Sequence, residues 1–244
     1  MSEARKKDYI NGLLKLPDIR NIADLLKLKL TDSQTKGLRV FIHFMEDVIG
    51  FEKILNINPD KWLKSLKIKT SQPKITFFND HDLEEAYPLI PVNLQTFFKL
   101  AAYTGARGIH LFRALQDFKP ENIQTDGDNP EVSFYPVTDA GRGNKSAFVL
   151  YFPSSFVDEL KSYELPHQHP STILKGLQDA GMPVKNLRKW HANLLLKHGV
   201  QESIVDYLQS RTSRTVIGRH YANLHMQACR AYSQTIQYFP EFTG

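Results

Sequence analysis

Apolar residues recur at helical spacing along most of this chain, and strands are predicted at one place only. Over residues 1–69 the apolar positions follow helical patterns, one around Leu13 and one from Leu38 to Ile49. Thr31 and the two polar residues after it are typical of a helix start, and Gly50 is typical of a helix end. The sequence therefore predicts that residues 1–69 form a small helical domain.

A polar stretch separates this segment from the rest of the chain. Residues 70–74, Thr-Ser-Gln-Pro-Lys, include a proline, and we predict a linker there. Beyond the linker, the patterns predict two helices, a pair of strands and then further helices, at 80–86, 92–104, 131–135, 147–152 and from 154 onward. The predicted fold class is mostly α with a small antiparallel β-sheet, an α+β fold, with residues 75–244 as a second domain.

The net charge of +5 is unevenly distributed. Residues 1–72 hold 14 Lys and Arg against 9 Asp and Glu, whereas residues 73–244 hold 17 of each class. A basic segment next to a neutral one suggests a polyanionic partner, because lysine and arginine bind phosphates and release counterions. We therefore include nucleic acid among the expected partners.

Other bulk features favour a soluble protein of a reducing compartment. No apolar run approaches the roughly 20 residues needed to span a bilayer. The polar start, MSEARKKDY, lacks the pattern of a secretory signal. The single cysteine, Cys229, excludes an intramolecular disulfide and a cysteine-rich zinc site. We expect a cytoplasmic location, no cofactor and no metal site.

Two segments place arginine where a phosphate could be held. Arg107 lies between two glycines just after the predicted helix 92–104, where a tight turn allows close approach of a ligand. Lys185 and Arg188 lie three residues apart at the start of another predicted helix, hence on one face at its positive end. Each segment could also be an ordinary solvated helix end.

Two further segments place basic side chains at a turn and beside a tyrosine. The predicted hairpin turn contains Lys145, with Arg142 as a competitor three residues earlier, and either side chain could reach a bound substrate. A basic run from Arg211 ends at Tyr221, directly after His220. Taken alone, Tyr221 could equally be a half-buried aromatic residue.

The order and spacing of these segments resemble the catalytic set of the tyrosine recombinase (phage integrase) family. Its members share an arginine, a hairpin lysine, a His-or-Lys-x-x-Arg motif, a His, Trp or Arg, and a tyrosine. Lys185 and Arg211 make the chain most similar to the archaeal virus and plasmid branch, the fusellovirus-type integrases. One departure is His110, where many relatives have an acidic residue. The residues that match the set are Arg107, Lys145, Lys185, Arg188, Arg211 and Tyr221.

The resemblance implies a DNA strand transferase that works without metal or ATP. Tyr221 would attack a phosphodiester to form a 3′-phosphotyrosine, the arginines would grip the non-bridging oxygens, and Lys185 would help remove the tyrosine proton. Lys145, or Arg142 in its place, would protonate the leaving 5′-oxygen. Residues 1–69 would be the core-binding domain that closes a C-shaped clamp around double-stranded DNA.

Assembly follows from the same resemblance. The stripe of apolar residues after Tyr221 needs a surface to bury it, either on its own domain or, as in the family, on a neighbouring protomer. We expect a tetramer on paired DNA sites. Two alternatives stay open, a DNA-binding accessory protein that does not cut and a type IB topoisomerase-like enzyme.

Overall fold

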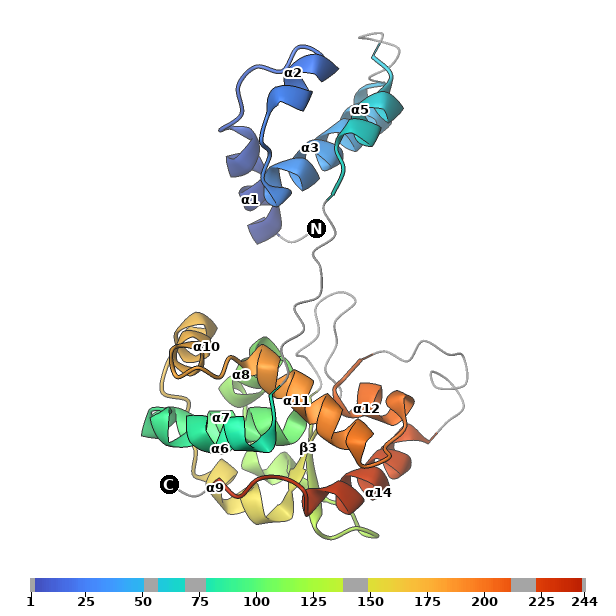
Figure 1. Ribbon diagram of the computed structural model, residues 1–244. Helices are drawn as coiled ribbons and strands as arrows, with labels where there is room; N and C mark the ends of the chain where they lie inside the picture. The colour runs from blue at the N-terminus through green and yellow to red at the C-terminus, as the bar shows by residue number, and fades with distance from the viewer. Residues whose placement is uncertain (1–2, 51–56, 69–77, 138–148, 212–222, 243–244) are drawn as a thin grey trace. The chain divides into compact units, whose positions relative to one another are not determined.

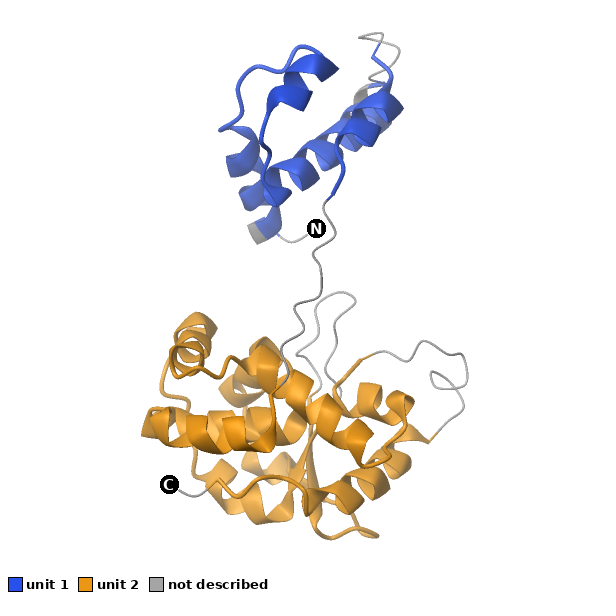
Figure 2. Ribbon diagram, in the orientation of Figure 1, with its two compact units in different colours: residues 1–74 blue, residues 75–244 orange. Residues whose placement is uncertain are grey.

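The chain divides into two compact units, residues 1–74 and residues 75–244 (Figure 2). The computed structural model describes residues 3–50, 57–68, 78–137, 149–211 and 223–242. The predicted linker lies outside these residues. Each unit has a hydrophobic core of its own.

Unit 1 is helical in its described part (Figure 1). Its helical elements are α1 (Glu3–Leu13), α2 (Ile22–Lys27), α3 (Asp32–Phe44), the π-helical turn η1 (Met45–Ile49) and α5 (Pro59–Ser65). Thr31 caps α3 reciprocally with Gln34, a capping box that satisfies two backbone donors. Gly50 ends η1 with φ 71°, in the left-handed region that glycine tolerates. The predicted helix start and helix end are both confirmed.

The core of unit 1 is small. Leu25, Ile42 and Leu66 are its buried members, and Trp62 packs against them. Arg39 ties α3 to α5, because its Nη1 donates to the carbonyls of Leu63 at 2.8 Å and Leu66 at 3.1 Å. Carbonyls in the last turn of a helix have hydrogen-bonding capacity left, so this arginine has a structural role.

Unit 2 contains most of the helices and all the described strands. Its α-helices are α6 (Asp80–Ala86), α7 (Val92–Thr104), α8 (Gly108–Gln116), α9 (Val157–Lys161), α10 (Pro170–Asp179), α11 (Val184–Lys197), α12 (Glu202–Leu208) and α14 (Leu224–Ile236). Three short 3-10 turns accompany them, η2 (Tyr87–Leu89), η3 (Pro120–Asn122) and η4 (Ser154–Phe156). The helices predicted over 80–86 and 92–104 are confirmed.

The sheet of unit 2 is antiparallel with strand order β1-β2-β3. The strands are β1 (Gln124–Thr125), β2 (Val132–Pro136) and β3 (Val149–Pro153). Phe134 of β2 lies opposite Tyr151 of β3. The two predicted strands are confirmed within one or two residues, while β1, a pair of exposed residues, was not predicted. The predicted hairpin turn lies outside the described residues.

Helix α7 lies at the centre of unit 2 and packs on α11 and β3. Phe97, Phe98 and Ala101 of this helix are fully buried. The apolar core therefore fixes the position of the C-terminal end of α7 and of the N-terminal half of α11. The fold class predicted from the sequence, mostly α with a small antiparallel sheet, is confirmed.

The C-terminal segment packs on its own unit. Helix α14 contacts α12, β2 and β3, with Tyr232 buried and its hydroxyl donating to the Tyr103 carbonyl at 3.0 Å. Phe242 lies within ring-contact distance of Phe98. Met226 and Tyr238 stay exposed. The apolar stripe is thus largely buried within the chain itself, and none of the described helices is long and apolar enough to cross a membrane.

Candidate active site

The candidate site begins at the end of α7. Gly105 caps this helix with φ 55° and is buried. A Cβ at this position would lie 2.4 Å from His191 Nδ1 and 2.8 Å from Gln209 Nε2, closer than any real contact. Glycine is therefore required twice, for the backbone conformation and for the close approach of two side chains.

Arg107 follows at the N-terminal boundary of α8. Its carbonyl accepts the first helical bonds, from the amides of His110 at 2.8 Å and Leu111 at 3.0 Å. The side chain is half-buried, and its Nη1 is shielded from solvent without a hydrogen-bond partner among the described residues. His110, at the position where many relatives have an acidic residue, is buried in α8.

Arg188 comes from α11 and reaches the same turn. Its Nη1 donates to the Gly105 carbonyl at 2.6 Å, which joins two segments far apart in the sequence. Its Nη2 is buried and, within the described ranges, has no partner. One side of the guanidinium is therefore fixed by the protein, and the other side has hydrogen-bonding capacity left.

Two buried polar residues support this arrangement. Gln209 Nε2 donates to the Arg188 carbonyl at 2.8 Å and lies 3.1 Å from His191 Nδ1. His191 is fully buried, and burial followed by the charge of Arg188 lowers its pKa to about 3. The imidazole is therefore neutral at physiological pH and adds no further positive charge.

Arg211 follows α12 after a strained turn. Ser210 has φ 54°, a conformation that non-glycine residues rarely adopt, and such strain often accompanies functional sites. The Arg211 amide donates to the Asp206 carbonyl at 2.7 Å, and its Nη1 lies 2.9 Å from Asp206 Oδ1. The ion pair is half-exposed on the arginine side, so it orients this side chain more than it stabilises the fold.

The three arginines lie close enough to affect one another. Burial, followed by the charges of Arg107 and Arg211, lowers the pKa of Arg188 to about 9. Burial and the charge of Arg211 lower the pKa of Arg107 as well. Asp206 is the carboxylate that opposes this effect on Arg188. We call Arg107, Arg188 and Arg211 the arginine cluster.

The arginine cluster has the properties of an oxyanion site. Like charges that are partly buried raise the free energy of the folded chain, and a bound anion removes that cost. Guanidinium groups present parallel donors that match phosphate oxygens, and the unpartnered Nη atoms of Arg107 and Arg188 supply such donors. The geometry therefore fits a phosphate group.

The other predicted residues differ in how the structure treats them. Lys185 is exposed on the first turn of α11, one turn before Arg188. Lys145, its competitor Arg142 and Tyr221 lie outside the described residues. The structure thus brings together three of the predicted site residues, Arg107, Arg188 and Arg211. It places a fourth, Lys185, on α11, the helix that carries Arg188.

Sequence reasoning missed the supporting residues. Gln209 carries no motif signal, and its role depends on a contact with α11 that only the folded chain creates. His191 is fully buried, and its contact with Gln209 likewise exists only in the folded chain. The sequence offered one signal for these contacts: a glycine, Gly105, stands two residues before Arg107, where side chains can approach the backbone closely.

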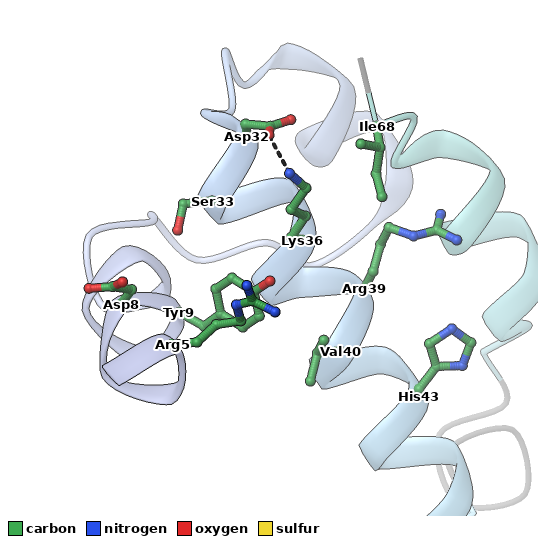
Figure 3. A pocket seen from close by; sticks show the side chains of 10 residues that line it. All are labelled: Arg5, Asp8, Tyr9, Asp32, Ser33, Lys36, Arg39, Val40, His43 and Ile68. Carbon is green, nitrogen blue, oxygen red and sulfur yellow. Dashed lines mark hydrogen bonds and ion pairs between the residues drawn. The ribbon is translucent and has the colours of Figure 1, made fainter. Parts of the chain in front are cut away.

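A second charged surface belongs to unit 1. An open hollow of about 770 Å³ is lined by Arg5, Lys36, Arg39 and His43 and also by two acidic residues, Asp8 and Asp32, of which Asp32 pairs with Lys36 (Figure 3). Arg39 is engaged by backbone carbonyls, so the lysine and arginine side chains that could offer charge to a ligand here are Arg5 and, once its pair with Asp32 opens, Lys36. No predicted catalytic residue lines this hollow.

Comparison with known proteins gives one family match. Residues 76–238 match the family described as archaeal phage integrase. No curated protein sequence matches the chain significantly.

Three solved structures have weakly similar folds. The integrase from mycobacterium phage Brujita is 13% identical, with 95% of this chain and 84% of that chain covered and a TM-score of 0.48. XerA recombinase is 15% identical, with 99% and 100% covered and a TM-score of 0.43. The XerH site-specific recombinase, bound to difH substrate in a pre-cleavage complex, is 13% identical, with 96% and 87% covered and a TM-score of 0.41.

Proposed function

Because the chain belongs to the archaeal phage integrase family, we propose that it is a site-specific DNA recombinase that cuts and rejoins strands through a 3′-phosphotyrosyl intermediate. The observation that supports this most is the arginine cluster, in which three cations from α8, α11 and the end of α12 converge. Two of them hold buried donors without partners in the described chain. A scissile phosphate is the anion that fits such a site in a DNA-cutting enzyme.

The proposed chemistry transfers the phosphorus between two oxygens. The Tyr221 oxygen forms a bond to phosphorus, the bond from phosphorus to the 5′-oxygen breaks, and Lys145 or Arg142 gives that oxygen a proton. Lys185, in its neutral amine form, would help to remove the proton from Tyr221. In the second half the 5′-hydroxyl of another strand attacks the phosphotyrosine, so the bond energy is conserved and no ATP is used.

The arginine cluster would act mainly in the transition state. Arg107 and Arg188 would hold the two non-bridging oxygens, and Arg211 would add a third contact as negative charge grows there. A fixed donor of this kind typically lowers the barrier by about 3–4 kcal/mol in a partly dry site. The contact from Arg188 to the Gly105 carbonyl would keep the fork in place before DNA binds.

Unit 1 would be the core-binding domain of this enzyme. Its excess positive charge and the hollow lined by Arg5 and Lys36 suit the phosphate backbone of double-stranded DNA. Phosphate contacts fix position without reading sequence, so these side chains would set the affinity for DNA. We further propose a tetramer on paired sites, although α14 buries most of its apolar face on its own unit.

A suicide substrate tests the proposal. DNA first selected for binding to the protein is nicked beside the cleavage position and incubated with the chain without added divalent metal. We expect a protein–DNA adduct that survives denaturation, its loss in Tyr221→Phe, and its retention in Tyr238→Phe, a matched change at an exposed tyrosine of the tail.

Paired sites on a plasmid separate the alternatives. Recombinant product supports the proposal. Relaxation of supercoils without recombinant product would instead indicate a topoisomerase, and binding without any adduct would indicate an accessory protein that does not cut.

A further inference from the structure

Three side chains with metal-ligating atoms meet at the start of α14, and none of them belongs to the arginine cluster. Asp126 follows β1, while His225 and Cys229 lie one turn apart on α14. One ligand atom from each residue lies within 4.8 Å of the other two. Among the described residues, this is the group of carboxylate, imidazole and thiol that could hold an ion.

The distances are close to those of a zinc site. Cys229 Sγ lies 3.8 Å from His225 Nε2. At a tetrahedral zinc ion, with bonds of about 2.3 Å to sulfur and about 2.0 Å to nitrogen, the two ligand atoms lie roughly 3.5 Å apart. A small side-chain rotation therefore converts the observed contact into a coordinating pair.

The imidazole of His225 is already oriented for this role. Its Nδ1 lies 2.7 Å from the Tyr151 hydroxyl, and its ring stands edge-on to Phe134 at 4.7 Å between centroids. Histidines that bind metals usually donate their other ring N–H to a fixed partner, which sets the tautomer and the ring plane. Tyr151 can be that partner, because its hydroxyl oxygen can accept the Nδ1–H and leave Nε2 available for the ion.

Asp126 presents a carboxylate that is held in place. Its Oδ1 accepts from the Asn129 amide at 2.8 Å and from Asn129 Nδ2 at 2.7 Å. These two bonds fix the orientation of the carboxylate, and one of its oxygens lies within 4.8 Å of a ligand atom of each of the other two residues.

Cys229 supplies the selective ligand. The thiol is buried and lies 3.8 Å from His225 Nε2. A soft divalent cation would bind the sulfur as a thiolate, with the thiol proton released to solvent and a metal–thiolate bond formed.

We propose that this cluster binds one Zn²⁺ through the Asp126 carboxylate, His225 Nε2 and the Cys229 thiolate, with water in the fourth position. The ion would pin the first two turns of α14 to the segment after β1. Helix α14 begins shortly after Tyr221 in the sequence, so the site would fix one end of the segment that carries this tyrosine. The ion would stabilise this part of the fold and would take no part in the chemistry of the arginine cluster.

Cobalt substitution gives a direct test, because Cys229 is the only cysteine of the chain. The full chain is stripped with a chelator and titrated with Co²⁺ and, separately, Zn²⁺. We expect one equivalent of Co²⁺ with a thiolate-to-cobalt charge-transfer band that Zn²⁺ displaces. The band should vanish in Cys229→Ser, and Zn²⁺ affinity should fall at least about 100-fold in His225→Gln and Asp126→Asn.

Two further variants separate ligation from packing. Tyr151→Phe keeps the ring and removes the partner of His225, and it should weaken Zn²⁺ binding by about 10- to 100-fold while the band remains. His81→Gln, at an exposed site on α6, should bind like the wild type. Circular dichroism checks that each variant is folded.

The proposal is overturned if the wild-type chain shows no thiolate band at saturating Co²⁺. It is equally overturned if Zn²⁺ binds with the same affinity to the folded variants Asp126→Asn, His225→Gln and wild type. The readouts are metal affinity and absorbance, so they do not depend on whether the chain cuts DNA.

Discussion

Unit 1 and unit 2 use positive charge in opposite ways. Residues 1–74 hold 15 Lys and Arg against 9 Asp and Glu, and the core of unit 1 has three buried members. Residues 75–244 hold 16 against 17, yet unit 2 has a large apolar core and three arginines that lie close enough to affect one another. Under the proposed function, the net charge of unit 1 would attract DNA, and the partly buried arginines of unit 2 would hold a phosphate.

The difference follows from solvation. Exposed cations are screened by water and salt, so each adds little and their effects add up along the DNA backbone. A cation that is partly buried beside other cations acts strongly on one group at one place. Substitutions in the two units should accordingly change different quantities.

The largest effect is expected for Arg188→Lys. Lysine keeps the positive charge but lacks the planar guanidinium of Arg188. In the wild type, one nitrogen of that group donates to the Gly105 carbonyl while the other can donate to the phosphate. We expect single-turnover cleavage at saturating DNA to slow by roughly 100- to 1000-fold, with DNA affinity nearly unchanged. The matched change Arg5→Lys in unit 1 should leave cleavage unaltered. A loss of affinity without a loss of rate in Arg188→Lys would remove the distinction between the units.

Gly105→Ala should destabilise unit 2 through a clash. The new Cβ would clash with His191 and Gln209, and the backbone at this position has φ 55°. Overpacking and backbone strain together should lower the free energy of unfolding by about 3 kcal/mol. Gly199→Ala has a similar backbone, φ 81°, but no atom within 4 Å, and should cost about 1 kcal/mol. Urea unfolding, followed by Trp190 in a Trp62→Phe background, measures both. Equal costs would show that the packing at Gly105 adjusts freely.

His191 should make unit 2 sensitive to acid. Its pKa is about 3 in the folded chain and about 6.5 when unfolded, so between these values the unfolded state binds the extra proton. Stability is therefore lost as the pH falls from about 6.5 towards 3. Between pH 7 and pH 4.5 we expect a loss of roughly 2 kcal/mol that is absent in His191→Asn. The same loss in both proteins would assign the acid sensitivity to other groups.

The smallest effects are expected in unit 1. Arg5→Gln and Lys36→Gln should each weaken DNA binding a few-fold and lower the slope of log K against log salt by about 0.9 for each phosphate that the variant no longer binds. Asp32→Asn removes the carboxylate that pairs with Lys36 and should strengthen binding slightly. Fluorescence anisotropy over a range of salt concentrations measures the slopes. Unchanged slopes would mean that DNA does not use this hollow.

Much of the architecture was predictable because local patterns dictate it. The capping residues around α3, the apolar residues of α7 and the residues of β2 and β3 all gave correct elements. Strand β1 was missed because two exposed residues carry no alternation. The resemblance to integrases, read from the motifs between Arg107 and Tyr221, is confirmed by the family match.

The site was less predictable where it depends on long-range contacts. Motif order predicted Arg107, Arg188 and Arg211, but nothing in the sequence pointed to Gln209 as the residue that links Arg188 to His191. Cys229 gave no metal signal because Asp126 lies far upstream and meets it only in the folded unit. Sequence motifs therefore predicted the residues proposed to bind a phosphate better than the residues that hold them in place.

The most direct test of the account is to find which residue carries the DNA. The adduct formed on a suicide substrate is digested with protease and nuclease, and mass spectrometry locates the nucleotide on the peptide. We predict a 3′-phosphate linked to Tyr221 and to no other residue. A link to a different side chain, or no covalent link from a chain that binds its selected DNA, would contradict the account.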